Sequence, residues 1–126
     1  MSGVTYDAGA LIAGERNSTP MWALHRRILA RGVWPTVSTG VLGQVWRGGP
    51  QAQLSRLLLG CDVEPLTEDH ARSAGAALAK SGARDLIDAV VVITALARGD
   101  LVVTSDPDDL TRIATAVGRS LRIHVI

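Results

Sequence analysis

The sequence of 126 residues is poor in several features, and each shortage narrows what the chain can be. It has a single cysteine, Cys61, so no disulfide can form within the chain, which agrees with a reducing compartment. No uncharged apolar run approaches the ~20 residues that span a bilayer, and the N-terminus lacks the basic and apolar regions of a signal peptide. We therefore expect a cytoplasmic protein that makes no contact with a membrane.

An excess of charge of one sign is also lacking. Thirteen lysines and arginines stand against twelve acids, for a net charge of +1, so there is no global basic field of the kind that marks many nucleic-acid-binding proteins. Any such binding must use a local patch. Lys80 is the only lysine, and a coding bias explains the excess of arginine as readily as phosphate binding does.

Phenylalanine is absent, and the large aromatic residues are mainly Trp22, Trp34 and Trp46. We expect these tryptophans to fill core volume or to anchor an interface, in preference to stacking on bases. Cys61 lies in the apolar segment LLLGCDV and is expected to be a small core residue. The histidines, at positions 25, 70 and 124, are too scattered to indicate a zinc site.

The rest of the chain alternates short apolar runs with helical patterns, which predicts an α/β domain with a short, mostly parallel central sheet and helices on both faces. We predict strands at 4–7, 35–38, 61–65, 101–105 and 122–126, the last at a sheet edge. We predict helices at 8–16, 20–32, 39–49, 50–60, 66–82, 83–99 and 106–118. The length fits one domain, residues 1–126.

Capping residues mark several of these helices. Thr19 is expected to cap the second helix with Pro20 at its first position, and Thr67 and Gly82 are expected to bound the helix 66–82. The apolar stripe of the helix 20–32 leaves three arginines outward, where they are either solvated or in contact with a substrate: Arg26, Arg27 and Arg31.

Three aspartates stand where predicted elements begin or end. Asp7 closes the first strand, Asp88 lies in the apolar helix DLIDAVVVITAL, and Asp106 follows LVVTS. The carboxyl ends of parallel strands form the ligand crevice of open α/β sheets, so we expect these carboxylates to meet there. Gathered carboxylates repel one another unless a cation neutralises them, and an all-oxygen donor set favours Mg²⁺ or Mn²⁺.

Each acid near these positions also has a structural interpretation. Asp7, Asp85 and Asp106 all precede helical patterns as N-caps do, and Asp109 stands in the first turn of the last predicted helix, where it compensates the helix dipole. Asp88 is harder to explain in this way, because an unpaired carboxylate on a buried helix face is unfavourable. Capping and metal binding are compatible, so both interpretations stay open.

Four segments, VTYDAGALIA, VSTGVLGQVWRGG, DLIDAVVVITAL and LVVTSDPDDL, resemble in this order the PIN domain, especially the toxin nucleases of VapBC-type toxin-antitoxin pairs. The resemblance covers essentially the whole chain. It implies a PIN-like domain with ribonuclease activity in which Asp7, Asp88 and Asp106 hold Mg²⁺ or Mn²⁺ and cleave RNA. It further implies a homodimer and a cognate antitoxin protein as partners.

The resemblance also implies supporting residues. Thr104 and Ser105 would lie beside the metal. Asp109 is more suitable than Asp108 for a position further from the metal. Such domains usually carry a glutamate in the helix after the second strand, where this chain has Gln44 and therefore lacks one negative charge. Arg47, three residues later in the same predicted helix, is either an RNA contact or a solvated arginine.

We hypothesise that Asp85 restores part of the charge missing at Gln44, because it lies three residues before Asp88 on one helix face. Two classes of function then remain: a metal-dependent endoribonuclease of the toxin type, and a metal-impaired PIN-like module that binds RNA or protein without cleavage. A phosphoacceptor receiver domain is disfavoured because the chain has no lysine near its end. A dinucleotide enzyme is disfavoured because GALIAG lacks the glycine spacing of the phosphate turn.

Overall fold

A five-stranded sheet runs through the centre of the computed structural model, which describes residues 3–126. The strand order is β3-β2-β1-β4-β5, and all neighbouring strands are parallel. The prediction of a parallel sheet is confirmed, with β5 at one edge and β3 at the other. The strands are β1 (Val4–Tyr6), β2 (Thr36–Ser38), β3 (Asp62–Glu64), β4 (Leu101–Thr104) and β5 (Ile123–Val125).

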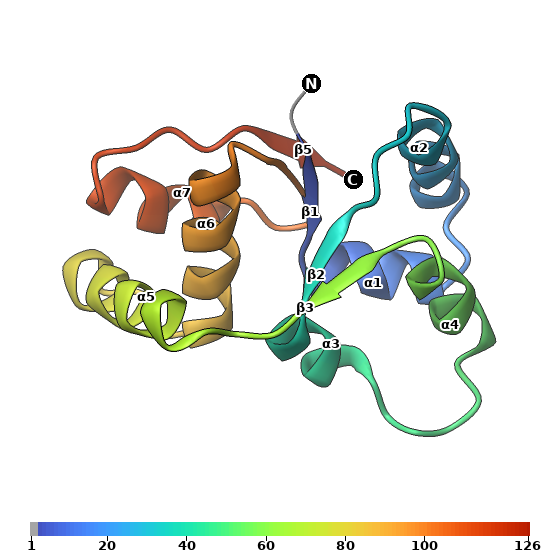
Figure 1. The fold of residues 1–126 in the computed structure, drawn as a ribbon, viewed down its shortest axis with the longest axis horizontal. Coiled ribbons are helices and arrows are strands. Elements are labelled where there is room, and N and C mark those ends of the chain that lie inside the picture. Colours follow the sequence, from blue (N-terminus) through green and yellow to red (C-terminus); the bar gives the residue numbers. More distant parts are fainter. Residues whose placement is uncertain (1–2) are drawn as a thin grey trace.

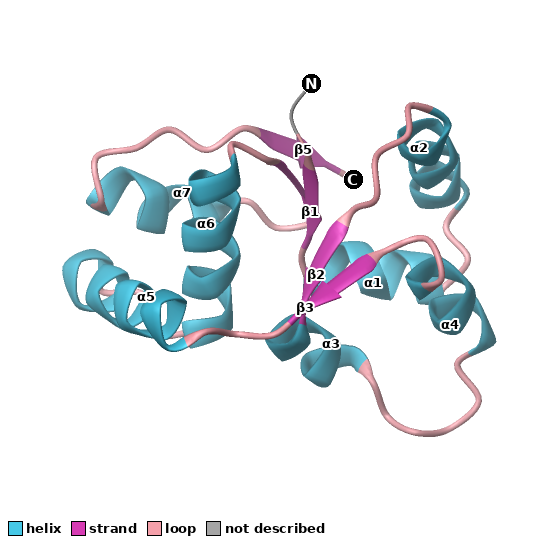
Figure 2. Ribbon diagram, in the orientation of Figure 1, coloured by secondary structure: helices cyan, strands magenta, loops and turns pink. Residues whose placement is uncertain are grey.

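Helices cover both faces of this sheet. Figure 1 shows α1, α2 and α4 on one side and α5, α6 and α7 on the other, and Figure 2 shows the same layers by type of secondary structure. The helices of the described chain are α1 (Ala8–Glu15), α2 (Thr19–Ala30), α3 (Thr39–Val45), α4 (Ala52–Leu58), α5 (Glu68–Ser81), α6 (Leu86–Arg98) and α7 (Asp108–Ala116). Each predicted helix and strand is therefore present, and the differences lie at their ends.

The start of α2 corrects one prediction. Ser18 is the N-cap, since its Oγ accepts a hydrogen bond from the N–H of Met21 at 3.3 Å, and Thr19 is the first helical residue. The preceding Asn17 has a φ of 58°, so the turn after α1 is completed one residue earlier than the Thr19-Pro20 pattern indicated. The expected caps of α5 are confirmed: Thr67 accepts from the N–H of His70, and Gly82 has a φ of 70°.

The end of α3 corrects a second prediction, that the helix runs to residue 49. It ends at Val45, because Trp46 already has an extended backbone with a ψ of 132°. Arg47 therefore lies in the loop after the helix that carries Gln44. The loop contains Gly48, with a φ of 77°, and Pro50, neither of which favours continuation of a helix.

The tryptophans are only partly core residues. Trp22 is 7% exposed and packs edge-on against His25, whose Nδ1 lies 2.8 Å from the hydroxyl of Tyr6. Trp34 and Trp46, however, are 57% and 44% exposed, so the prediction of a core position is wrong for both. They lie in loops, before Pro35 and after α3, whereas the core consists mainly of aliphatic side chains. Interface anchoring of these two residues stays a prediction.

Cys61 is buried, as predicted, and its thiol donates to the carbonyl of Leu57. Burial, with a smaller contribution from the neighbouring charge of Asp62, raises the pKa of the thiol to about 12. Cys61 is thus a core residue and not a reactive thiol. None of the helices in residues 3–126 is long and apolar enough to cross a membrane.

Candidate metal centre

Asp7 lies at the carboxyl end of β1, in the middle of the sheet. Its backbone N–H donates to the carbonyl of Val103 in β4, which fixes it beside the end of that strand. The side chain is only 8% exposed and caps α1, because Oδ1 accepts from the N–H of Ala10 at 3.0 Å. Asp7 is therefore a helix cap, and the cap holds its carboxylate at the carboxyl end of the central strand.

Thr104, the last residue of β4, connects Asp7 with Asp106. Its hydroxyl is fully buried, accepts from the N–H of Asp106 at 3.0 Å and donates to the carbonyl of that residue at 3.2 Å. Burial raises the pKa of Asp7, and the charge of Asp106 makes a smaller contribution in the same direction. The Thr104 hydroxyl and the N–H groups of Ala10 and Gly9 act to lower this pKa. The turn after β4 thus places the charge of Asp106 within electrostatic reach of Asp7.

Asp88 lies in the first turn of α6 and is partly buried. Its pKa is raised to about 6, first by burial and then by the charges of four other aspartates, in decreasing order Asp85, Asp109, Asp7 and Asp106. The structure therefore brings these carboxylates within electrostatic reach of Asp88. A cation among them would relieve this repulsion.

Asp85 is the N-cap of α6. Its Oδ1 accepts from the N–H groups of Ile87 and Asp88, at 2.8 and 3.3 Å. The expected alternative of a cap is therefore present, and the same side chain is the largest charge acting on Asp88. Asp106, by contrast, is not the N-cap of α7: Pro107 holds that position, and Asp106 Oδ1 accepts from the N–H of Asp108 at 3.4 Å.

Two glycines allow the elements of this region to approach closely, and the sequence analysis did not single them out. A Cβ at Gly9 in α1 would overlap Oγ of Ser105, which follows β4. A Cβ at Gly40 in α3 would lie 2.6 Å from Cδ1 of Ile87 in α6. Each glycine stands two residues after an N-cap, and this position is the only sequence signal that could have indicated them.

Gln44 and Arg47 both line an open depression of about 430 Å³ between α1, α3 and the following loop. Neither Asp88 nor the four aspartates near it line this depression. The guanidinium of Arg47 donates to the carbonyls of Gly43, Gln44 and Trp46, so it caps the end of α3. Asp109 forms an ion pair with Arg112 at 3.0 Å.

The chemistry of these side chains fits a hard divalent cation, but their positions do not form a finished site. The donors are carboxylate and hydroxyl oxygens, which suit Mg²⁺ or Mn²⁺. Within residues 3–126, however, no three His, Cys, Asp or Glu side chains are close enough together to hold a metal ion. Asp7, Asp88 and Asp106 would therefore need to move toward a common centre on binding.

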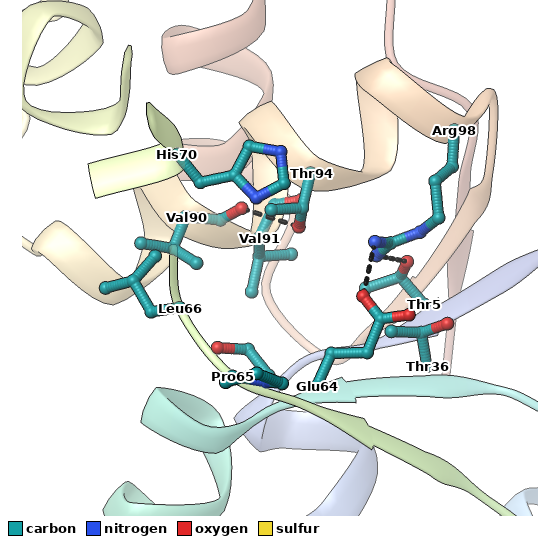
Figure 3. Close-up of a pocket in the computed structure, with 11 residues that line it drawn as sticks. Thr5, Thr36, Glu64, Pro65, Leu66, His70, Val90, Val91, Thr94 and Arg98 are labelled. Atoms are coloured by element: carbon teal, nitrogen blue, oxygen red, sulfur yellow. Dashed lines mark hydrogen bonds and ion pairs between the residues drawn. The ribbon is translucent and has the colours of Figure 1, made fainter. Parts of the chain in front are cut away.

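A second crevice lies between β2, β3 and α6, and Figure 3 shows the residues that line it. Its volume of about 10 Å³ holds roughly one water molecule. Arg98 of α6 crosses it to Glu64 of β3 at 2.9 Å, and it also pairs with buried Asp100 at 3.0 Å. These contacts connect the edge strand to α6, and the crevice has no room for a substrate.

The fold is that of an α/β domain with a parallel sheet, and aspartates gather at the carboxyl ends of its central strands. Residues 7–116 match the family model of the PIN domain, so the chain belongs to the PIN domain family. This match includes Asp7, Asp88 and Asp106. No curated protein matches the sequence.

Several solved structures have the same fold. VapBC2 from Rickettsia felis, bound to a DNA fragment from its promoter, has a TM-score of 0.72 at 14% identity, covering 98% of each chain. DNA-bound VapBC from Salmonella typhimurium has a TM-score of 0.71 at 20% identity, covering 99% of this chain and 98% of that one. VapC20 from Mycobacterium tuberculosis, a toxin that cleaves the sarcin-ricin loop, has a TM-score of 0.66 at 18% identity, covering 94% and 97%.

Proposed function

We propose that this protein is a Mg²⁺- or Mn²⁺-dependent endoribonuclease and the toxin component of a VapBC-type toxin-antitoxin pair. The observation that carries the proposal is the group of carboxylates around Asp88, whose combined charge helps to raise its pKa to about 6. Such an arrangement is unfavourable without a cation and is therefore typical of a functional site. Membership in the PIN family and the fold shared with VapC toxins support the same activity.

In this proposal Asp7, Asp88 and Asp106 hold the metal. A cation bound by these residues would supply an activated water and would neutralise charge on the phosphodiester and the leaving oxygen. Thr104 orients the backbone of Asp106 through two hydrogen bonds, and its hydroxyl acts to lower the pKa of Asp7, so this threonine lies between the two acids. Ser105 lies against the start of α1, where its hydroxyl can orient a water.

Gln44 leaves the site with less negative charge than PIN domains usually have. Asp85 supports the proposal because its charge acts strongly on Asp88 while its Oδ1 holds the first turn of α6. The second candidate function, a PIN-like module that binds RNA or protein without cleavage, is favoured by the absence of an assembled metal site within residues 3–126.

The partners in this proposal are an RNA substrate, a cognate antitoxin and a second copy of the chain, in the cytoplasm. Support for an antitoxin comes from structures with the same fold, which include VapBC and other toxin-antitoxin complexes. Trp34 and Trp46, both largely exposed, are suitable anchors for protein interfaces.

Cleavage of a structured RNA by the purified protein tests the proposal. We expect cleavage with Mg²⁺ or Mn²⁺, none with EDTA, and a loss of at least about 100-fold in Asp88→Asn. Asp69→Asn is the matched control, because it removes the same charge from an exposed position of α5. Equal cleavage by the wild type and Asp88→Asn would indicate a contaminating nuclease and contradict the proposal. No cleavage by the wild type, together with no metal binding, would favour the binding module.

A further inference from the structure

A basic groove lies at the opposite end of the sheet from the carboxylates. It is formed by α2 and by the amino-terminal ends of β1, β4 and β5, and it has a volume of about 310 Å³. In Figure 1, α2 stands next to the end of the sheet at which β1 begins. The groove is large enough for a small ligand or for one unit of a polymer.

Four basic side chains line this groove, and no acid does: Arg27, Arg31, Arg122 and His124. Arg27 lies in the last turn of α2 and Arg31 is the C-cap, four residues later, and both are exposed. Within residues 3–126 neither forms an ion pair or a hydrogen bond through its side chain. Arg122 donates one N–H to the carbonyl of Gly99 at 2.7 Å, which fixes its guanidinium on the facing wall.

The carboxylate of Asp100, next to the groove, does not neutralise it. Asp100 comes close to the backbone of Gly3, a lining residue. Its side chain is buried, however, and is engaged by the hydroxyl of Thr5 at 2.8 Å and by Arg98 at 3.0 Å. The groove therefore presents uncompensated positive charge to solvent.

The floor of the groove is aliphatic, and it includes Leu24, Ile28, Val33 and Leu101. Arginines around an apolar floor match a ligand that has negative charge and a flat or apolar body. A nucleotide has both, because its phosphate can accept bidentate hydrogen bonds from arginine while the face of its base covers apolar surface.

We propose that this groove is a second RNA-binding site, which holds one nucleotide of the substrate and its flanking phosphates away from the carboxylates. This inference rests on the proposed function, since RNA is the polyanion that the carboxylate site would cleave. Val4 in the groove and Asp7 at the carboxylates are three residues apart along one strand, or about 10 Å. A few nucleotides can therefore contact both ends of the sheet, passing over the open edge at β5.

The experiment measures binding of a fluorescein-labelled, single-stranded 12-nucleotide RNA by fluorescence anisotropy, in EDTA, so that cleavage does not contribute. The test variant is Arg27→Gln/Arg31→Gln in the full chain. The control is Arg72→Gln/Lys80→Gln, which removes the same charge from exposed positions of α5. Thermal unfolding of all three proteins checks that the exposed substitutions leave the fold intact.

We expect the Kd of the test variant to rise about tenfold or more, and the slope of log Kd against log salt to fall by about 1 to 2 relative to the wild type. The control should stay within about twofold of the wild type. Equal weakening of both variants would overturn the proposal, because it would indicate general electrostatic attraction. Unchanged RNA binding would overturn it as well.

An acidic protein segment is the other ligand that suits a basic groove with an apolar floor. A fluorescein-labelled peptide of alternating glutamate and leucine tests for it. Binding of this peptide that is lost in Arg27→Gln/Arg31→Gln, while RNA binding stays unchanged, would assign the groove to an acidic protein segment and overturn the proposal. A further outcome is RNA binding that depends on these arginines in a protein that cleaves no RNA with Mn²⁺. That result would support RNA binding in the groove and contradict only the nuclease function.

Discussion

The protonation state of Asp88 affects the stability of the folded protein. Asp88 has a pKa of about 6 in the folded chain and 3.8 without the fold, so the folded state binds its proton more tightly. The contribution to stability is therefore fully present below pH 3.8 and is lost as the pH rises through about 6. At neutral pH the ionised side chain lowers the free energy of unfolding.

Asp88→Asn should therefore stabilise the metal-free protein at pH 7.5. We expect a gain of about 1 kcal/mol in the free energy of unfolding, because the partial exposure of the side chain screens the full effect of the shift. Urea unfolding in EDTA at pH 7.5 and at pH 4 measures this, and the gain should vanish at the lower pH. A loss of stability at both values would show that the carboxylate is not under electrostatic repulsion.

Asp85 combines a structural and an electrostatic role that one substitution can separate. Asn is as good an N-cap as Asp, so Asp85→Asn should keep the first turn of α6 and change the unfolding free energy by less than about 0.5 kcal/mol. The lost charge should weaken Mn²⁺ binding by about three- to tenfold. Unchanged Mn²⁺ affinity, measured by calorimetry, would refute the idea that Asp85 compensates for Gln44.

At the scale of elements, the carboxylates depend on how closely α1 and α6 approach the turn after β4. Asp7 and Asp85 were foreseen both as caps and as site residues, and each makes its cap hydrogen bonds. The sequence indicates such caps because they need only one residue type next to a helical pattern. It does not indicate the close approach at Gly9, which depends on a residue nearly a hundred positions away, Ser105.

Gly9→Ala should disturb this approach, because its Cβ overlaps Oγ of Ser105. We expect a destabilisation of about 1–3 kcal/mol and weaker Mn²⁺ binding as α1 moves away from Asp106. Gly75→Ala in α5 is the matched control, since nothing lies within 4 Å of its new Cβ, and it should stabilise by up to about 1 kcal/mol. Similar unfolding curves for the two variants would contradict the role given to Gly9.

At the scale of the whole molecule, the sequence predicted the parallel sheet and the order of its helices, because alternating apolar patterns and caps are local signals. The predictions from sequence were wrong where contacts between distant parts of the chain determine the structure. The exposure of Trp34 and Trp46 depends on which loops are covered by a second layer, and the end of α3 depends on the loop that follows it. The basic groove could not be foreseen either, since α2 and β5 meet only in the fold.

The central claim is that Asp7, Asp88 and Asp106 form a metal centre, and calorimetric titration with Mn²⁺ tests it most directly. We predict one binding site per chain for the wild type at pH 7.5, and affinities at least about tenfold lower for Asp7→Asn and Asp88→Asn, because each removes a charged ligand. Asp69→Asn should bind like the wild type. An absence of binding to the wild type, or equal binding to all four proteins, would contradict the account.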